Sequence, residues 1–155
     1  MAEPKPDEET AEILQLRELA ALVRTAILVA RDRFPHPLKQ KFSAFPKNCC
    51  AHASVLLVLY LKDLGVKRVY RVFNGKHIQD VKKSHAWVEV GEIIVDITAD
   101  QFPDNPPVIV TDNRKWHACF DGEQRTAEIL EDFSEKAMQN YREAYAAVRE
   151  SLSIN

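Results

Sequence analysis

The segment from Ser84 to Thr98 has two arms of alternating apolar and polar residues, joined by Gly91-Glu92. Alternation with a period of two in both arms predicts a pair of antiparallel β-strands. Glycine in the first position of a two-residue loop is typical of a type II′ turn, because that position needs a positive φ. The apolar side chains then share one face, and a one-residue slip would turn every one of them over. They are Ala86, Val88, Val90, Ile93, Val95 and Ile97.

The opposite face of this predicted hairpin carries the polar groups. In this register Trp87 lies across from Asp96, so His85 and Asp96 are diagonal neighbours with Cα atoms about 7–8 Å apart. Their side chains are therefore within reach of each other. A carboxylate in such an apolar strand is costly to bury unless it is paired, which favours His85 as the partner. This face consists of His85, Trp87, Glu89, Ile94, Asp96 and Thr98.

A long helix is expected before the hairpin. Apolar residues at spacings of three and four run from about Glu8 to Phe34, and Pro35 and Pro37 end the pattern. The prolines and lysines of residues 35–47 predict a loop that drapes over a groove.

The central segment of the chain predicts a second, buried helix over 49–64. Asn48 is a good N-cap and Gly65 a good C′ residue. Residues 55–61 are apolar on every side of the helix, so we expect other elements to surround it.

The remaining elements complete an α+β fold. We expect a strand over 66–73, a turn at Asn74-Gly75 and a polar connection over 76–83. After the hairpin come a loop over 99–107, a short strand over 108–111, irregular chain over 113–122 and a final helix from about Thr126 to Leu152, in which Leu130 is one of the apolar positions. The predicted architecture is a central helix packed on a small antiparallel sheet and flanked by long N- and C-terminal helices. We expect residues 1–155 to form one domain, with residues 1–7 flexible.

Composition excludes several classes of protein. Apolar residues make up 46%, charged residues 28%, and the net charge is −2, which gives no reason to expect a nucleic-acid surface. No apolar run is long enough to span a membrane, and the first ten residues lack a secretory apolar segment. Three cysteines, two of them adjacent, do not suggest a disulfide framework. We therefore expect a cytoplasmic protein without a membrane partner.

Cys49 and Cys50 lie where the central helix is predicted to begin. Unpaired backbone N–H groups and the helix dipole favour a thiolate there. If the hairpin packs against that end of the helix, His85 can take the thiol proton while Asp96 orients the imidazole. Backbone N–H groups of the helix start, with the Asn48 side chain, would then stabilise an oxyanion.

These residues resemble those of the transglutaminase-like branch of the papain-like cysteine hydrolases. The resemblance covers about residues 48–102 and rests on three pieces: Cys50-x-x-x-Ser54 opening an apolar helix, His85-Ala-Trp-Val-Glu89, and Asp96-Ile-Thr98. Asp96-Ile-Thr-Ala-Asp-Gln-Phe102 is also similar to small bacterial members, including processing proteases of the lasso-peptide type.

The resemblance implies Cys50 as nucleophile, His85 as general base and acid, and Asp96 as orienting carboxylate. It further implies peptidase, amidase, deamidase or acyl-transfer chemistry on a peptide, protein or other amide-containing substrate, without a cofactor or a catalytic metal. Because no calcium-loop signature is present, protein crosslinking is the less expected activity.

Several neighbouring residues keep two interpretations. Cys49 is the alternative nucleophile, although the spacing to Ser54 favours Cys50. Trp87 is expected as a wall beside the triad, and Gln101 either binds substrate or oxyanion or is a surface amide. Glu89 is expected on a solvated face and His52 near the site without taking part. We expect structural or exposed positions for His36, His77, His117 and Cys119.

Two other functions remain open. One is a zinc site, for which the chain offers Cys49, Cys50, His52, His85, His117 and Cys119 as ligands. The spacings do not match a common zinc motif, and adjacent cysteines rarely share a structural zinc ion. The other is a binding module that keeps the fold without catalysis, which the complete triad disfavours.

Overall fold

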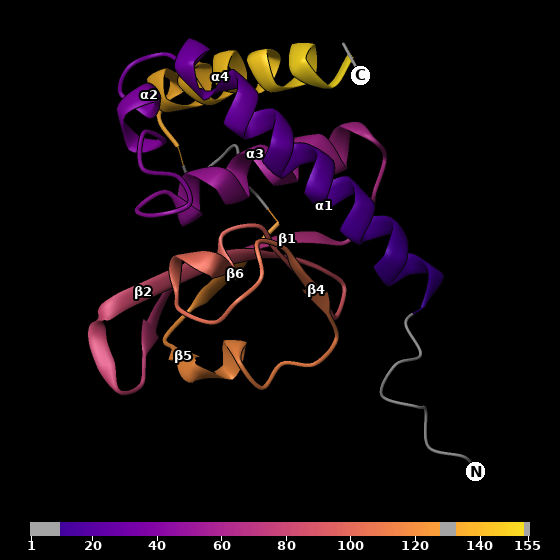
Figure 1. Ribbon diagram of the computed structural model, residues 1–155, viewed down its shortest axis with the longest axis vertical. Helices are drawn as coiled ribbons and strands as arrows, with labels where there is room; N and C mark the ends of the chain where they lie inside the picture. The colour runs from indigo at the N-terminus through magenta and orange to yellow at the C-terminus, as the bar shows by residue number, and fades with distance from the viewer. Residues whose placement is uncertain (1–9, 128–132, 154–155) are drawn as a thin grey trace.

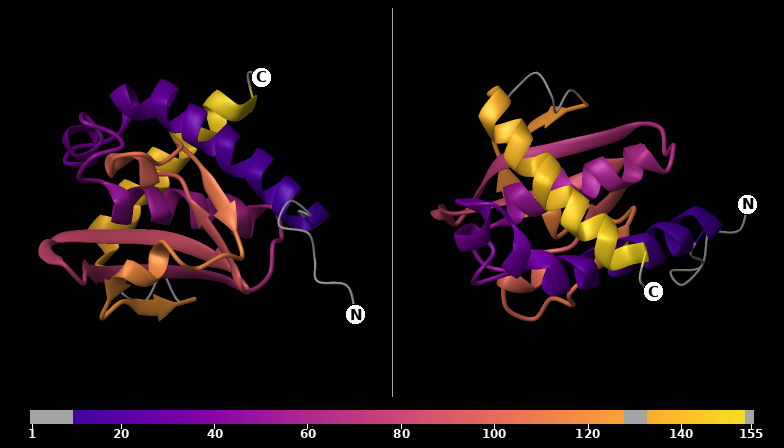
Figure 2. Two further views of the ribbon diagram at one scale, coloured as in Figure 1. Left: turned by 60° about the horizontal axis from the view of Figure 1, so that its bottom comes forward. Right: turned by 90° about the horizontal axis from the view of Figure 1, so that it is seen from above.

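The structure, a computed structural model, describes residues 10–127 and 133–153 and has an α+β architecture. A layer of helices covers one face of an antiparallel six-stranded sheet (Figures 1 and 2). The strand order is β4-β3-β2-β1-β5, and β6 also pairs with β1. The helices are α1 (Ala11–Ala30), α2 (Leu38–Lys41), α3 (Cys50–Asp63) and α4 (Glu135–Ser153). The strands are β1 (Val69–His77), β2 (Asp80–Val90), β3 (Ile93–Asp96), β4 (Ile109–Thr111), β5 (Phe120–Asp121) and β6 (Gln124–Thr126).

The first helix, α1, begins where a side chain caps it. The Thr10 hydroxyl accepts a hydrogen bond from the Ile13 backbone N–H at 3.1 Å. The helix ends at Ala30 and continues as a single 3-10 turn over Arg31–Arg33, so the helical chain stops close to the predicted Phe34. The predicted start at Glu8 lies outside the described residues.

The central helix, α3, differs from the prediction at its start. Asn48 has a φ of 65° and is not the N-cap; that position belongs to Cys49, whose side chain makes no capping hydrogen bond. Asparagine tolerates the left-handed conformation, and here it turns the chain into the helix. The C-terminal prediction is confirmed, because Gly65 has a φ of 80° and the Val66 N–H bonds the Leu61 carbonyl in a Schellman motif.

The register of the β2–β3 hairpin is confirmed where the two strands pair. Val90 pairs with Ile93 and Val88 with Val95, and Gly91 has the positive φ, 58°, that the turn requires. The pairing stops at Val88, so the part of β2 before that residue extends past the end of β3.

The predicted turn at Asn74-Gly75 is wrong. Both residues lie inside β1, where the register shifts between Val72 and Gly75 and Asn74 has a φ of 64°. The left-handed residue makes an irregularity in the strand and does not reverse the chain. The reversal comes after His77, and the predicted polar connection over 76–83 contributes to two paired strands.

Both faces of the sheet are buried. The apolar hairpin face packs with α1, α3 and α4 in the main core, which includes Leu56, Val58, Val88 and Val95. Figure 2 shows that the chain after β4 runs along the side of the sheet away from the helices. A second, smaller cluster forms there from Val72, Trp87, Ile94 and Phe120, with Phe102 and Trp116 packed against it.

The loops on either side of the central elements contain short regular pieces. The segment 35–47 includes α2, and Phe42 and Phe45 anchor it in the main core. The region 113–122, predicted as irregular, holds a 3-10 turn over His117–Cys119 and strand β5. The last helix begins at Glu135 and not near Thr126, which is in β6; Leu130 lies outside the described residues.

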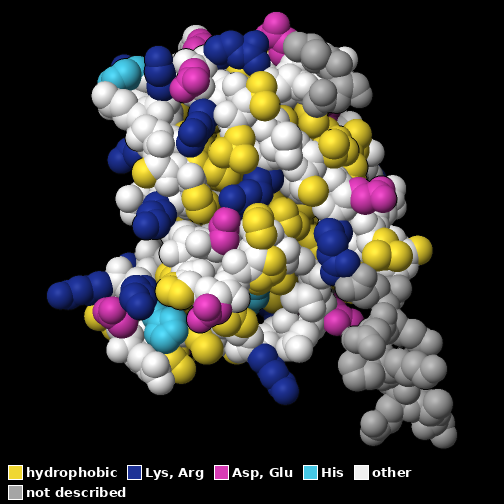
Figure 3. All heavy atoms as spheres, viewed as in Figure 1, with side chains coloured by type: hydrophobic (Ala, Val, Ile, Leu, Met, Phe, Trp, Pro, Cys, Tyr) yellow, Lys and Arg dark blue, Asp and Glu magenta, His cyan; other side chains and the backbone are white. Residues whose placement is uncertain are grey.

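The outer side of α1 keeps apolar side chains at the surface. Leu14, Leu22, Leu28 and Val29 are between 42% and 64% exposed. In Figure 3 hydrophobic side chains interrupt the charged surface on the face where α1 lies. Among the described residues, no helix is long and apolar enough to cross a membrane.

An arginine of α1 holds the loop that follows β3. The Arg24 guanidinium donates to both Asp100 carboxylate oxygens, at 2.9 and 2.8 Å. It also donates to the backbone carbonyls of Ile97 and Pro107, at 2.7 and 3.1 Å. One side chain therefore ties both ends of the loop to the helix layer.

We predict that Arg24→Met lowers the free energy of unfolding by about 2–3 kcal/mol, because it leaves the partly buried Asp100 carboxylate and two carbonyls without this donor. Urea unfolding measures the change. Glu150→Gln is the control, because it removes an ion pair with Arg33 whose side chains are 46% and 66% exposed and is expected to cost less than about 0.5 kcal/mol. Equal losses in the two variants would show that the Arg24 tether contributes no more than a surface ion pair.

Candidate functional site

Three side chains from separate elements meet at the N-terminal end of α3. Cys50 is in the first turn of that helix, His85 is on β2 and Asp96 ends β3. The His85 Nε2 atom lies 2.6 Å from Asp96 Oδ2, and both side chains are fully buried. The Cys50 thiol hydrogen-bonds the same imidazole. The structure thus brings together the three residues predicted as a triad, in the order Cys50, His85, Asp96.

The electrostatics of these groups favour an ion pair between thiolate and imidazolium. Burial alone would raise the pKa of the Cys50 thiol, but the hydrogen bond and charge of His85 outweigh burial and lower it below its ordinary value. Burial likewise opposes a charged His85, yet the Asp96 carboxylate and Cys50 raise the pKa of His85 to about 9. The pKa of Asp96 lies well below its usual range despite burial, because two imidazoles hydrogen-bond it.

Three groups hydrogen-bond the buried Asp96 carboxylate. Besides His85, His117 places its Nε2 atom 2.8 Å from the same oxygen, Oδ2. The other oxygen, Oδ1, accepts a hydrogen bond from the Thr98 backbone N–H at 3.0 Å. His117 is 3% exposed. The place of His117 in the site could not be predicted from the sequence, because its 3-10 turn follows an irregular stretch with no periodicity.

An aromatic enclosure holds the His85 ring. The rings of Phe102, Trp116 and Phe120 have centroids 5.1, 5.7 and 5.4 Å from the imidazole centroid, and Trp87 lies at 5.5 Å. This cage limits the water around the His85–Asp96 contact, which strengthens it.

The thiol lies at the uncovered edge of β2. Along an antiparallel strand the backbone N–H groups point alternately to either side. Val88 and Val90 pair toward β3, so Ala86 points its N–H to that side as well, beyond the end of β3. Cys50 occupies this position and accepts the Ala86 N–H hydrogen bond. The hairpin register therefore decides which backbone N–H of β2 hydrogen-bonds the Cys50 thiol.

Gln101 completes the surroundings of the thiol. Its side-chain Nε2 atom lies 3.1 Å from His85 Nδ1, and its amide also hydrogen-bonds Cys50. The residue ends the 3-10 turn Ala99–Gln101, whose Asp100 is held by Arg24. Gln101 therefore lies at the site, and its role in binding substrate or an oxyanion stays a prediction.

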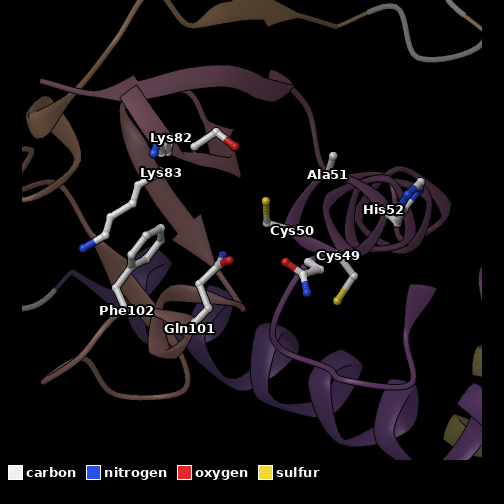
Figure 4. Close-up of a pocket in the computed structure, with 10 residues that line it drawn as sticks. Cys49, Cys50, Ala51, His52, Lys82, Lys83, Gln101 and Phe102 are labelled. Atoms are coloured by element: carbon white, nitrogen blue, oxygen red, sulfur yellow. The ribbon is translucent and has the colours of Figure 1, made fainter. Parts of the chain in front are cut away.

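A cleft of about 350 Å³ opens beside Cys50. Figure 4 shows Cys50 and Gln101 on facing sides of the cleft, whereas the Cys49 sulfur points away from the Cys50 sulfur. Burial raises the pKa of Cys49 to about 12. The wall of the cleft is formed by Asn48, Cys49, Cys50, Ala51, His52, Lys82, Lys83, Ser84, Gln101 and Phe102.

The other predicted site residues take different places. Asn48 is exposed and lines the cleft. Trp87 does not line it: the ring is 3% exposed and its Nε1 donates to Glu89 at 3.0 Å. The prediction of a solvated Glu89 is wrong, because this carboxylate is buried and paired with Arg114 and Arg125.

The remaining candidates lie at the margin of the site. His52 lines the cleft but hydrogen-bonds Tyr141 through Nδ1 at 2.7 Å, away from Cys50. The expectation that His52 lies near the site is thus met. Loop 99–107 contributes Gln101 and Phe102 to the wall, whereas segment 35–47 contributes none of the lining residues.

The ligands considered for zinc are not assembled as one set. Among the described residues, the potential metal-binding group of three is His85, Asp96 and His117, with ligand atoms within 4.8 Å of one another. None of the cysteines belongs to it. Both imidazole Nε2 atoms already hydrogen-bond one Asp96 oxygen, so the group satisfies its own polar atoms.

Comparison with known proteins adds no relative: no protein-family model, curated protein or solved structure matches the chain.

We predict that Cys50 is alkylated by iodoacetamide faster than an ordinary thiol at about pH 7. Its pKa lies below the ordinary value of 9.0, so the thiolate is present at a pH where a normal thiol is protonated. His85→Ala removes the imidazolium, which lowers the Cys50 pKa through its hydrogen bond and its charge, and leaves only the hydrogen bonds of Gln101 and the Ala86 N–H against burial. The rate is therefore expected to fall at least about tenfold. His52→Ala is the matched control and leaves the rate unchanged. Superimposable rate–pH profiles for wild type and His85→Ala would contradict the ion pair.

We predict that His117→Leu lowers the free energy of unfolding by about 2–3 kcal/mol, because it takes one donor from a fully buried carboxylate. Chemical denaturation of the full chain tests this. His36→Leu serves as the control, because His36 is exposed, and it should change stability by less than about 0.5 kcal/mol. A loss no larger than that of the control would mean that Asp96 does not depend on its second imidazole.

Proposed function

We propose that the chain is a cysteine-dependent hydrolase or acyltransferase that acts on an amide or peptide bond through Cys50, His85 and Asp96. The observation that carries this proposal is the continuous hydrogen-bonded path from a thiol of lowered pKa, through a buried imidazole, to a buried carboxylate. The resemblance of the same three residues to the transglutaminase-like cysteine hydrolases supports it. A cytoplasmic location belongs to the same proposal.

In the first step the Cys50 thiolate attacks the carbonyl carbon of the amide. The carbon–sulfur bond forms as the carbonyl π electrons move to oxygen, which becomes an oxyanion. Collapse of this intermediate breaks the carbon–nitrogen bond, and the His85 imidazolium gives its Nδ1 proton to the leaving amine. A thioester on Cys50 remains.

In the second step an acceptor resolves the thioester. His85, now neutral, takes a proton from water or an amine, and the acceptor attacks the thioester carbon. Water completes a hydrolysis or a deamidation, and an amine completes an acyl transfer. Asp96 keeps the Nε2 proton of His85 in place throughout, so that Nδ1 faces the sulfur.

Hydrogen-bond donors are available for the oxyanion. The first backbone N–H groups of a helix have no partner inside it, and the Cys49 side chain does not cap those of α3. The Gln101 side-chain amide also hydrogen-bonds the Cys50 sulfur. Donors fixed before the reaction stabilise the developing charge without reorganisation.

A metal site at His85, Asp96 and His117 is the second candidate. The cluster of their ligand atoms favours it. Stoichiometric zinc in purified protein, with loss of the Cys50 reaction after dialysis against a chelator, would select this function. The thiol-hydrolase proposal requires a reaction that chelation does not change.

We predict that p-nitrophenyl acetate, a general acyl donor, acetylates Cys50, and that mass spectrometry of the intact chain and of its peptides finds the thioester there. Cys50→Ser and His85→Ala should slow release of p-nitrophenol at least about 100-fold. Cys49→Ser is the matched control, and its rate should stay within about twofold of wild type because that thiol is buried with a pKa raised to about 12.

Acetylation that moves to Cys49 or Cys119, or that survives Cys50→Ser, would refute Cys50 as the nucleophile. Added hydroxylamine distinguishes the two second steps: a hydroxamate product indicates acyl transfer, and acetate alone indicates hydrolysis. A chain that binds peptides but forms no thioester would instead be a binding module.

A further inference from the structure

We propose that the cleft beside Cys50 selects an extended peptide with an acidic residue, whose carboxylate is bound on the side lined by Lys82 and Lys83. The inference rests on the proposed function of Cys50 and adds a substrate class to it.

The cleft combines the nucleophile with positive charge that has no counterion. Lys82 and Lys83 line it together with Cys50, and neither aspartate nor glutamate belongs to its wall. Both lysines are exposed, and no carboxylate in residues 10–127 or 133–153 forms an ion pair with either. Figure 4 shows both on β2, across the cleft from α3.

The acidic groups nearest to the site are all occupied. Asp96 is held by two imidazoles, Asp100 by Arg24, and Glu89 by two arginines. Asp80, at the start of β2, accepts a hydrogen bond from the Lys82 backbone N–H at 3.1 Å, and no ion pair joins it to the ammonium group of Lys82 or Lys83. The chain as a whole has a net charge of −2, so this local excess of positive charge does not reflect a basic protein. A charged wall with low-dielectric surroundings attracts ligands of the opposite sign.

The strand that carries the lysines leaves an edge open to an extended peptide. Residues of β2 before Val88 have no partner in β3, and Ala86 points its N–H along this edge to the sulfur. An extended chain can lie along an uncovered strand edge. A strand rises about 3.3 Å per residue, so Lys83 lies about 7 Å along β2 from His85. The acidic residue is therefore expected about two residues from the amide that reacts.

Lys82 and Lys83 point to opposite sides of β2, as neighbours in a strand do. Because both still line the cleft, the cleft extends around the edge of the strand. In Figure 3 Lys and Arg side chains project from the region of the β1–β2 hairpin. Exposed charges of this kind are screened by salt, so their effect should be moderate and should depend on ionic strength.

The test compares alkylation of Cys50 by iodoacetate, an anion, with alkylation by neutral iodoacetamide, in the full chain carrying Cys119→Ser. Lys82→Gln/Lys83→Gln should lower the ratio of the iodoacetate rate to the iodoacetamide rate about three- to tenfold. Lys67→Gln/Lys115→Gln makes the same change in net charge away from the cleft and should leave the ratio unchanged. In wild type the ratio should also fall as salt is raised to about 0.5 M.

A second arm uses short acetylated peptides that differ only in glutamate or glutamine two residues from a central amide. The glutamate peptide should protect Cys50 from iodoacetamide at a concentration at least about threefold lower, and Lys82→Gln/Lys83→Gln should abolish the difference. Equal protection by the two peptides overturns the acidic-peptide inference, as does a rate ratio that neither salt nor the substitutions change.

Failure of the proposed function has a separate signature. If iodoacetamide reacts with wild-type Cys50 no faster than with an ordinary thiol, the activated nucleophile itself is refuted. If that reaction is fast and only the charge dependence is missing, the nucleophile stands and the acidic substrate is refuted.

Discussion

The site depends on one buried carboxylate. Asp96 is fully buried at the end of a short apolar strand, where an unpaired charge would be strongly destabilising. The free-energy cost of burying the Asp96 charge is offset by hydrogen-bond donors from three segments: His85 on β2, His117 on the 3-10 turn after β4, and the Thr98 backbone. The carboxylate thus links three segments of the chain, and the imidazole that faces Cys50 is one of its partners.

The Asp96 carboxylate fixes the position of His85. Helix α3 and the loop after β3 place Cys50 and Gln101 beside its imidazole. The β2–β3 register sets the height of His85 relative to Asp96, and the end of β3 leaves the edge of β2 open for the Cys50 thiol. Arg24 holds the loop that presents Gln101. Each layer of the fold therefore contributes one constraint to the position of the thiol.

The hairpin and the helices were predictable because local rules decide them. Alternation and a glycine turn specify the pairing of Val88 with Val95, and Gly65 marks the end of α3. The irregular Asn74-Gly75 segment imitates a turn, since the same residue types permit a left-handed conformation within a strand. The expected diagonal contact between His85 and Asp96 followed from register alone.

Tertiary packing decides the features that the sequence did not reveal. Glu89 occupies a polar position in the alternating pattern of β2, which is typical of a solvated residue. In the structure Arg114 and Arg125, from later in the chain, pair with it. His117 reaches Asp96 from a segment without a periodic pattern. Such contacts join residues 21 or more positions apart and leave no local signal. The α1 surface is a further example, because its helical pattern does not predict that Leu22 and Val29 stay exposed.

The proposed thiolate–imidazolium pair is tested most directly by the charge state of His85. Nuclear magnetic resonance of the ¹⁵N-labelled imidazole distinguishes an imidazolium, protonated on both nitrogens, from the neutral ring. We expect His85 to be an imidazolium at about pH 7 and to titrate near its raised pKa of about 9. Cys50→Ala should lower this pKa, because it removes the thiolate. A neutral His85 ring at about pH 7 in the wild-type chain would contradict the thiolate–imidazolium pair on which the proposed chemistry depends.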